Sequence, residues 1–276
     1  MKHRIVVDGR ARQIDIRPMD GSFVVYRKMY VPPLTRENIG TIAPHDDVPQ
    51  LERFKKEGWL RVLEEFFRKQ IRALGSCAVL AWDGDGVVGK MHFTTGEMYN
   101  AFRQAGGWYC VDHESMPKII QSFAEEEVER LLASDSRTLV GVCFNVGHFD
   151  TQYHGKGIAS AMVEFLKNWA RERGWQRLEM PSCPDIVPFR CVGPQIMRRG
   201  WLERRGFSVI QETRVSDKDA AARRQAIETI ASGRWDTEAW DFNFYRFNLE
   251  NIKALASDSS SWTAEYDKDY VMAYDL

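Results

Sequence analysis

The spacing of apolar residues along the chain predicts strands and helices that are interleaved. Residues 1–30 alternate polar and apolar positions in short runs, which predicts one or two strands. From Leu51 to Leu74 the apolar residues recur at helical spacing, which predicts one helix with a break near Gly58. Two apolar runs within 77–93 flank an Asp-Gly turn, and this arrangement is typical of a β-hairpin.

The rest of the chain continues the interleaved pattern, with glycine or proline at most boundaries. The predicted strands are 138–149, 177–180, 207–210 and 241–249. The predicted helices are 117–132, 158–173, 195–204 and 216–233, the last with Ser216 as its N-terminal cap. Interleaved elements of this kind predict an α/β or α+β fold.

Composition and charge exclude several classes of protein. The 276 residues are 44% hydrophobic, which is enough for a packed core and excludes global disorder. The formal net charge of −1 argues against a nucleic-acid partner. No apolar run approaches the roughly 20 residues that span a bilayer, so we expect no membrane partner and a cytoplasmic location. The five cysteines are scattered without a CxxC pair, so we expect neither a disulfide scaffold nor a bound metal.

Local sequence implies a ligand at the junction between the strand 138–149 and the helix 158–173. Gly155 and Gly157 leave the backbone unencumbered just before the helix begins. The first N–H groups of a helix have no partner within it, and the macrodipole places about half a positive charge there. Such a terminus binds phosphate, and Lys156 adds positive charge.

Two familiar phosphate-binding patterns do not fit this turn. A P-loop requires Gly-x-x-x-x-Gly-Lys-Ser/Thr, which is a different spacing. A dinucleotide fingerprint requires Gly-x-Gly-x-x-Gly, and Ser160 stands at its third glycine position. A third pattern, Gln/Arg-x-x-Gly-x-Gly/Ala, matches the run Gln152-Tyr153-His154-Gly155-Lys156-Gly157. A plain glycine-bearing connection without a ligand also satisfies so short a pattern.

Through this motif and the Ile158-Ala159 that follows it, the chain resembles the GNAT N-acetyltransferase superfamily, in which the pattern binds pyrophosphate. The hairpin 77–93, the strand 177–180 and the Gly206-Phe207 pair stand in the family's order, so the resemblance spans about 77–249. It implies a central mixed, mostly antiparallel sheet that is splayed at the CoA strand and flanked by helices.

The resemblance also implies a single GNAT-like domain over 1–276. N-terminal strands and helices take up 1–76, an insertion covers 95–137, and a tail follows over 250–276. Because the end of this tail is polar and acidic, we expect a mobile segment, a docked arm or an arm exchanged in an oligomer. Otherwise we expect a monomer or a homodimer.

By the same resemblance, the co-substrate is acetyl-CoA or another acyl-CoA, and the acceptor is a small-molecule or peptide amine. The residues expected to hold the acyl-CoA are the strand end and the turn: Gly147, His148, Phe149, Gln152, Tyr153, His154, Gly155, Lys156, Gly157, Ile158, Ala159 and Ser160. Backbone N–H groups are expected to make most of the contacts, because His154 stands where many members carry arginine.

Two catalytic positions depart from the family pattern. The position of the usual glutamate base falls on Cys143, and that of the usual tyrosine acid falls on Leu202. Asn145 and His148 are therefore the candidate catalytic residues, Asn145 to orient the amine or a water and His148 as a titratable group. The main hypothesis is an acyl-CoA-dependent N-acyltransferase, and the alternative is a non-catalytic acyl-CoA-binding or regulatory module.

Overall fold

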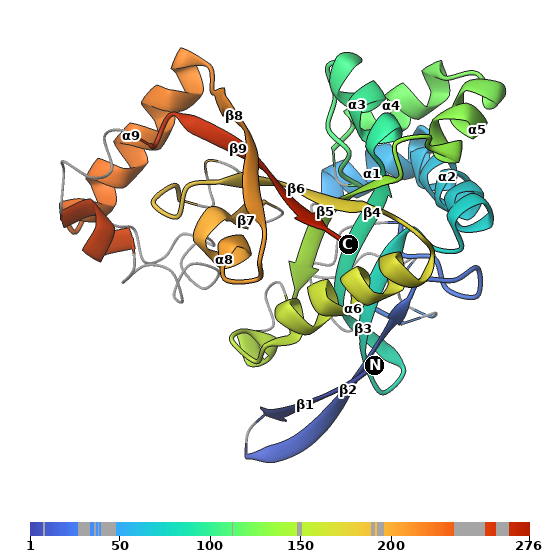
Figure 1. Ribbon diagram of the computed structural model, residues 1–276, viewed down its shortest axis with the longest axis horizontal. Helices are drawn as coiled ribbons and strands as arrows, with labels where there is room; N and C mark the ends of the chain where they lie inside the picture. Colours follow the sequence, from blue (N-terminus) through green and yellow to red (C-terminus); the bar gives the residue numbers. More distant parts are fainter. Residues whose placement is uncertain are drawn as a thin grey trace. The chain divides into compact units, whose positions relative to one another are not determined.

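The computed structural model describes residues 1–7, 9–26, 34, 35, 37, 39, 48–111, 113–147, 151–188, 191, 196–234, 252–257 and 265–276. Within these residues the chain divides into two compact units (Figure 1). The first unit comprises Met1–Leu178 together with Leu276, and the second comprises Glu179–Asp275. Each unit has a hydrophobic core of its own.

The first unit is built on an antiparallel meander. Its strands follow one another across the sheet in chain order: β1 (Lys2–Val7), β2 (Arg10–Pro18), β3 (Ala78–Asp83), β4 (Gly86–Thr95) and β5 (Thr138–Val146). The predicted strands within 1–30, the hairpin within 77–93 and the strand that begins at Thr138 are confirmed. Every residue of β4 is buried, which requires that both faces of the sheet are covered.

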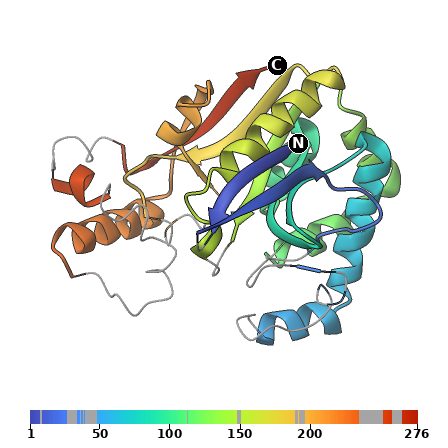
Figure 2. The same ribbon diagram turned by 90° about the horizontal axis from the view of Figure 1, so that it is seen from below.

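Helices cover both faces of this sheet. The described helices of the first unit are α1 (Val48–Lys56), α2 (Trp59–Leu74), α3 (Gly96–Gln104), α4 (Ser115–Ser122), α5 (Glu125–Ala133) and α6 (Ile158–Glu172). His92 and Phe93 are neighbours on β4, so their side chains point to opposite faces. His92 lies against Phe67 of α2, whereas Phe93 lies against Trp169 of α6. The ribbons of these helices and of the sheet can be followed in Figure 2. None of the described helices is long and apolar enough to cross a membrane.

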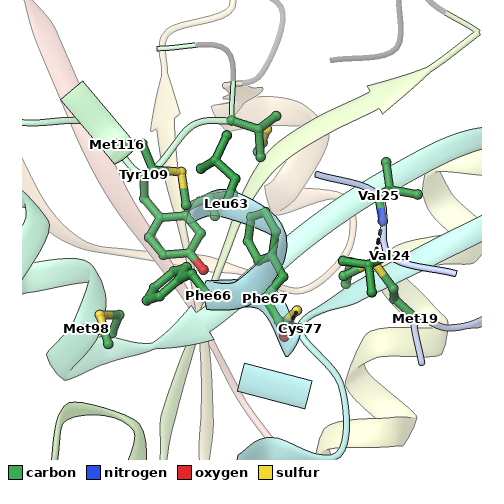
Figure 3. Packing of buried hydrophobic residues seen from close by; sticks show 14 of the residues in the cluster. Met19, Val24, Val25, Leu63, Phe66, Phe67, Cys77, Met98, Tyr109 and Met116 are labelled. Carbon is green, nitrogen blue, oxygen red and sulfur yellow. Dashed lines mark hydrogen bonds between the residues drawn. The ribbon is translucent and has the colours of Figure 1, made fainter. Parts of the chain in front are cut away.

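The larger core of the first unit lies between α2 and the sheet. Leu63, Phe66 and Phe67 project from α2 toward Cys77 and Tyr109, and all five side chains are buried (Figure 3). Burying an apolar side chain of this size stabilises the fold by about 1.5–3 kcal/mol. This packing fixes the position of α2 over β4.

The structure confirms one helix prediction in this unit and corrects another. The break at Gly58 is confirmed, because this residue has a φ of 70° and separates α1 from α2. The single helix predicted over 117–132 is wrong, since Phe123 adopts an extended conformation and separates α4 from α5. Three glutamates then fill the first turn of α5, where the helix dipole favours negative charge. Charge at a new N-terminus thus accounts for the break.

The second unit contains a smaller group of strands in the order β6-β9-β8. Its elements are β6 (Arg177–Cys183, in this unit from Glu179), β7 (Met197–Arg198), α8 (Arg199–Glu203), β8 (Ser208–Arg214), α9 (Asp217–Ala231) and β9 (Lys268–Asp275). β7 is parallel to β6, and β8 is antiparallel to β9. The Ser216 cap of α9 is confirmed, because its side chain accepts the N–H of Asp219.

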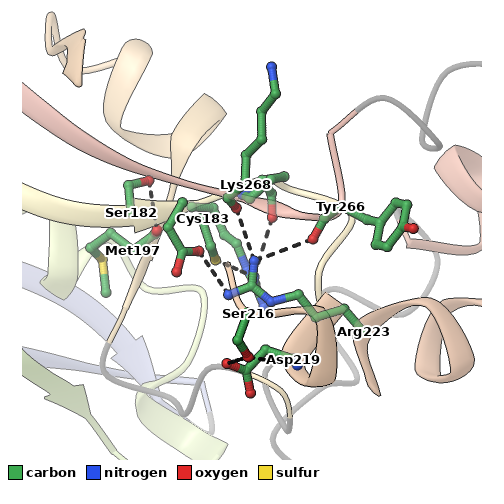
Figure 4. A network of polar contacts seen from close by, with 11 residues as sticks. Ser182, Cys183, Met197, Ser216, Asp219, Arg223, Tyr266 and Lys268 are labelled. Carbon is green, nitrogen blue, oxygen red and sulfur yellow. Dashed lines mark hydrogen bonds and ion pairs between the residues drawn. The ribbon is translucent and has the colours of Figure 1, made fainter. Parts of the chain in front are cut away.

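A buried arginine joins α9 to β9. The Arg223 guanidinium donates to the backbone oxygens of Tyr266 and Lys268, at 3.3 and 2.9 Å, and forms an ion pair of 2.8 Å with Asp269 (Figure 4). A buried charge is stable only when it is paired and hydrogen-bonded in this way. The last strand is therefore an integral part of the second unit.

Two predictions in this unit are corrected. The helix predicted over 195–204 is shortened to α8, because Met197 and Arg198 extend and pair with β6. The core was expected to close near 249, but β9 lies within the predicted tail and pairs with β8. The strand predicted over 241–249 lies outside the described residues.

Candidate functional site

The turn between β5 and α6 is formed by left-handed glycines at a helix N-terminus. Gly147 ends β5, and its N–H donates to the Val88 oxygen at 2.9 Å. A short 3-10 turn over Thr151–Tyr153 leads to Gly155 and Gly157, whose φ angles are 67° and 77°. Gly157 is the N-terminal cap of α6 and provides no capping side chain. The first N–H groups of α6 therefore face a position that no cap side chain occupies.

Neighbouring strands hold this turn in place. The Tyr153 hydroxyl donates to Asp83 at the end of β3, at 2.9 Å. The same carboxylate accepts a hydrogen bond of 2.8 Å from Arg12 on β2. On the other side, His3 Nε2 lies 2.8 Å from the Lys156 backbone oxygen. These contacts fix both ends of an otherwise exposed glycine segment.

The surface of the turn leaves room for a ligand but not for larger side chains. Gly155, Lys156 and Gly157 are exposed, whereas Ile158 is buried and anchors the helix. A Cβ atom at Gly157 would lie 3.3 Å from His3 Nε2, which is closer than an ordinary contact. Its left-handed backbone also disfavours any residue with a side chain. The turn thus combines exposed glycines with a helix N-terminus, an arrangement that phosphate-binding sites use.

A β-bulge interrupts the pairing of β4 with β5. Lys90 pairs with Asn145 and His92 with Val142, so Cys143 and Phe144 together lie opposite one residue of β4. Cys143 has a φ of 51°, which is unusual for a residue other than glycine. Bulges re-aim side chains and recur beside active sites. Here the bulge turns the Cys143 thiol toward β4.

A row of buried polar side chains, which we call the polar stripe, follows the same sheet face. It consists of Lys90, His92 and Thr94 on β4, Cys143 and Asn145 on β5, and Gln70 and Tyr109 beside them. Lys90 is 1% exposed, and its ammonium donates to Cys143 Sγ at 3.8 Å. Residues two apart on a strand share a face, which explains the alternation along β4.

Hydrogen bonds extend the polar stripe to α2. The Thr94 hydroxyl donates to Gln70 Oε1 at 2.8 Å, and Gln70 Nε2 donates to the Tyr109 hydroxyl at 2.5 Å. Burial is the main reason that the pKa of Tyr109 is raised well above its usual range. Burial likewise raises the pKa of the Cys77 thiol. Both groups therefore stay protonated at neutral pH.

The structure places the predicted site residues unevenly. Gln152 to Ser160 form the turn and the first residues of α6, and Gly147 ends β5. Asn145 is buried in the polar stripe, opposite Lys90. His148 and Phe149 lie outside the described residues. Leu202, in the second unit, is fully buried and has no titratable group.

Sequence reasoning missed Lys90, Gln70 and Thr94. The signal in the sequence was the alternation of Lys90, His92 and Thr94 with apolar residues, which by itself predicts a solvent-facing strand side. Helix α2 covers that side instead, so these polar groups are internal. Within the part of the chain that the structure describes, no group of three His, Cys, Asp or Glu side chains is placed to hold a metal ion.

Comparisons with known proteins find similarity among solved structures alone. No family model and no curated protein matches this sequence. An agmatine N-acetyltransferase in its apo form is 14% identical and superposes with a TM-score of 0.40, covering 95% of this chain and 99% of that chain. The polyamine N-acetyltransferase of Drosophila melanogaster is 14% identical, with a TM-score of 0.39 and coverage of 95% and 100%.

A Mycobacterium tuberculosis protein in complex with CoA is also similar. It is 14% identical, with a TM-score of 0.31, and the alignment covers 75% of this chain and 80% of that chain. The described chain itself has the mixed, mostly antiparallel sheet flanked by helices that the sequence predicted.

Proposed function

We propose that this chain is an acyl-CoA-dependent N-acyltransferase of the GNAT kind, which transfers an acetyl group from acetyl-CoA to an amine. The single observation that carries the proposal is the turn, where two left-handed glycines precede an N-terminus of α6 without a side-chain cap. Backbone N–H groups in that geometry suit the pyrophosphate of CoA. The exposure of Gly155, Lys156 and Gly157 supports the same interpretation, because the backbone of the turn is open to solvent there.

The residues of the turn have different roles in this proposal. Backbone N–H groups from Tyr153 to Ala159 would hold the pyrophosphate, with the Gln152 and Ser160 side chains at the two ends of the turn. Lys156 is exposed, so its charge is screened by solvent and adds little. Asp83 and His3 keep the backbone in position from outside, through Tyr153 and the Lys156 oxygen. The site is therefore preorganised mainly by its backbone.

We further infer that the Lys90–Cys143 pair takes up a proton from the acceptor ammonium. Both side chains are buried at the bulge, and Lys90 Nζ lies 3.8 Å from Cys143 Sγ. A general base must lie within hydrogen-bond reach of the proton that it accepts, directly or through one water. His92, Tyr109 and Cys77 are the other titratable groups on this sheet face.

In the proposed transfer, the acceptor ammonium gives up two protons. The acceptor ammonium loses a proton to the Lys90–Cys143 pair, and the neutral amine attacks the thioester carbonyl. A C–N bond forms and the C–S bond breaks, so the CoA thiolate leaves and takes a second proton from the nitrogen. The amide keeps the third hydrogen, and the pair returns its proton to water. Asn145, which lies opposite Lys90, would orient the amine by a hydrogen bond.

A second candidate function is a non-catalytic acyl-CoA-binding module. The observation that favours it is the lack of a carboxylate at the bulge, where Cys143 stands, together with the buried Leu202. Both candidate functions require acyl-CoA binding at the turn. They differ in whether CoA is released when an amine is present.

A CoA-release assay over a library of small amines and peptides tests the proposal, with thermal shifts recorded alongside. Acetyl-CoA is expected to raise the melting temperature, whereas NADH and ATP are not, because ligands stabilise the state to which they bind. Release of CoA with one amine class establishes the transferase. A thermal shift without turnover on any amine favours the module, and no shift with acetyl-CoA refutes both.

A further inference from the structure

A pocket of about 810 Å³ lies at the opposite end of β5 from the glycine turn. It is enclosed by the end of α2, one side of α5, and the segments that precede β5 and follow α6. Strand β5 has nine residues, so the pocket and the turn are about 30 Å apart at roughly 3.3 Å per residue. All of its lining residues belong to the first unit.

The pocket carries more cationic than anionic side chains. Lys69, Arg72, Arg137 and Arg173 line it, against Glu125 and Glu129. Lys69 is already neutralised by an ion pair of 2.6 Å with Glu125. The excess positive charge therefore resides on the three arginines.

These arginines use few of their hydrogen-bond donors within the protein. Arg137 donates to the Gly174 oxygen at 3.2 Å, and Arg173 donates to the Trp169 oxygen at 3.4 Å. Arg173 otherwise contacts Glu172 at 3.9 Å, and the charge of Arg72 acts on Glu125, which is hydrogen-bonded to Lys69. A guanidinium has five N–H donors, so most of these donors remain available to a ligand.

The local backbone positions two of the three guanidiniums. Arg137 has a φ of 49°, a left-handed conformation that a side chain disfavours. A Cβ atom at Gly174 would lie 3.1 Å from Arg137 Nη1, and one at Gly75 would lie 3.7 Å from Arg173 Nε. Arg173 is also held by its guanidinium, which lies 4.3 Å from the centre of the Trp169 ring. Gly174 thus leaves space for the Arg137 guanidinium, and Gly75 and the Trp169 ring flank that of Arg173.

We propose that this pocket binds a small organic anion. A carboxylate or phosphate group of the ligand pairs with Arg72, Arg137 and Arg173, since guanidinium groups recognise both by paired hydrogen bonds. The apolar part of the ligand lies against Leu132 and Trp175, which line the same pocket. The pocket is distinct from the acyl-CoA turn, so this site does not depend on the proposed transferase activity.

Arginines close to helix C-termini also have a plain structural role, because they stabilise the negative end of the helix dipole. This role predicts a loss of thermal stability when the arginines are replaced, and no affinity for anions. Direct binding measurements separate the two interpretations.

Isothermal titration of the full chain at constant ionic strength provides the test. The probes are phenyl phosphate, benzoate and inorganic phosphate, so that the phosphate, carboxylate and apolar contributions are separated. We expect phenyl phosphate to bind, and Trp175→Ala to remove its advantage over inorganic phosphate. Arg72→Gln is expected to weaken binding about tenfold, because it removes one charge-assisted pair. Arg72 is exposed and Glu125 keeps its hydrogen bond to Lys69, so this variant is expected to fold normally.

One control makes the result specific. Arg61→Gln removes an arginine that pairs with Glu65 away from the pocket, and it should leave binding unchanged. The proposal is overturned if no probe binds, if Arg72→Gln binds as the wild type does, or if Arg61→Gln weakens binding equally.

Discussion

The glycine turn and the polar stripe belong to the same unit and to the same proposed reaction, but they are built from different groups. The turn is exposed and is made by backbone conformation, and its side chains add little. The polar stripe is buried and is made by side chains from β4, β5 and α2 that meet across the sheet. In the proposed reaction, binding of the phosphates and transfer of the acyl group therefore depend on separate features, which single substitutions are able to separate.

The largest expected effect is at the turn. Gly157→Val should remove detectable acetyl-CoA binding, because a branched side chain in a left-handed position meets His3 and fills the space that the pyrophosphate requires. Gly106→Val is the matched control, since Gly106 has a φ of 74° and no atom within 4 Å of its Cβ position. Calorimetry with acetyl-CoA measures both variants.

Lys156→Ala should change the dissociation constant less than about threefold, because exposed charge is screened. An equal loss in Lys156→Ala would show that side-chain charge, rather than the backbone, holds the ligand.

The second expected effect separates the polar stripe from the turn. Lys90→Met should lower kcat by about 10²- to 10⁴-fold, the usual contribution of a positioned acid or base, while acetyl-CoA affinity is retained. Lys167→Met is the matched control, because Lys167 is also a buried lysine, on α6, paired with Glu164. Steady-state rates and acetyl-CoA titrations measure the two effects. If Lys90→Met keeps full kcat, the polar stripe is structural and the proton goes elsewhere.

The third expected effect concerns stability. Gln70→Leu should lower the free energy of unfolding by about 2 kcal/mol or more, because it leaves the buried Thr94 and Tyr109 hydroxyls without this partner. Tyr153→Phe removes one hydrogen bond at the more exposed turn and should cost about 1 kcal/mol. Urea denaturation of both variants compares them. A greater loss in Tyr153→Phe would contradict the view that the polar stripe is the more tightly coupled region.

The smallest expected effect is on the pH dependence of stability. The pKa of Tyr109 is raised in the folded chain, so the unfolded chain loses this proton first, at its ordinary pKa of about 10. Stability from this group is complete below that pH and falls as the pH rises toward the folded pKa. The slope is at most about 1.4 kcal/mol per pH unit for one proton. Denaturation at several alkaline pH values should show a shallower slope in Tyr109→Phe, whereas an unchanged slope would mean that Tyr109 does not contribute.

The same contrast explains what the sequence could predict. The turn was predictable because a left-handed glycine and a helix N-terminus depend on a few consecutive residues. The polar stripe was not, because Lys90 and Cys143 meet through a bulge that shifts the register by one residue. The alternation along β4 correctly predicts that its polar side chains share one face. It does not predict that α2 covers this face.

Sequence patterns failed in the second unit for a related reason. The C-terminal segment was expected to be a polar tail, because residues 257–276 carry five acidic residues against one lysine. In the structure Lys268–Asp275 pairs with β8 and is held by Arg223 of α9. Strand pairing supplied by distant residues is not visible in the local pattern. The prediction of one helix over 117–132 failed although the apolar spacing is continuous. Three glutamates favour a new helix N-terminus at the start of α5.

The pairing of β8 with β9 has a consequence for how this chain folds. Arg214 lies opposite Lys268, and about 50 residues of chain separate them. The hairpins of the first unit close over a few residues, so they have low contact order and form early. On a ribosome that adds about 5–20 residues per second, β8 would wait several seconds for its partner strand. During that interval the edge of β8 that pairs with β9 is open, so chaperones should act on this strand until β9 has been synthesised.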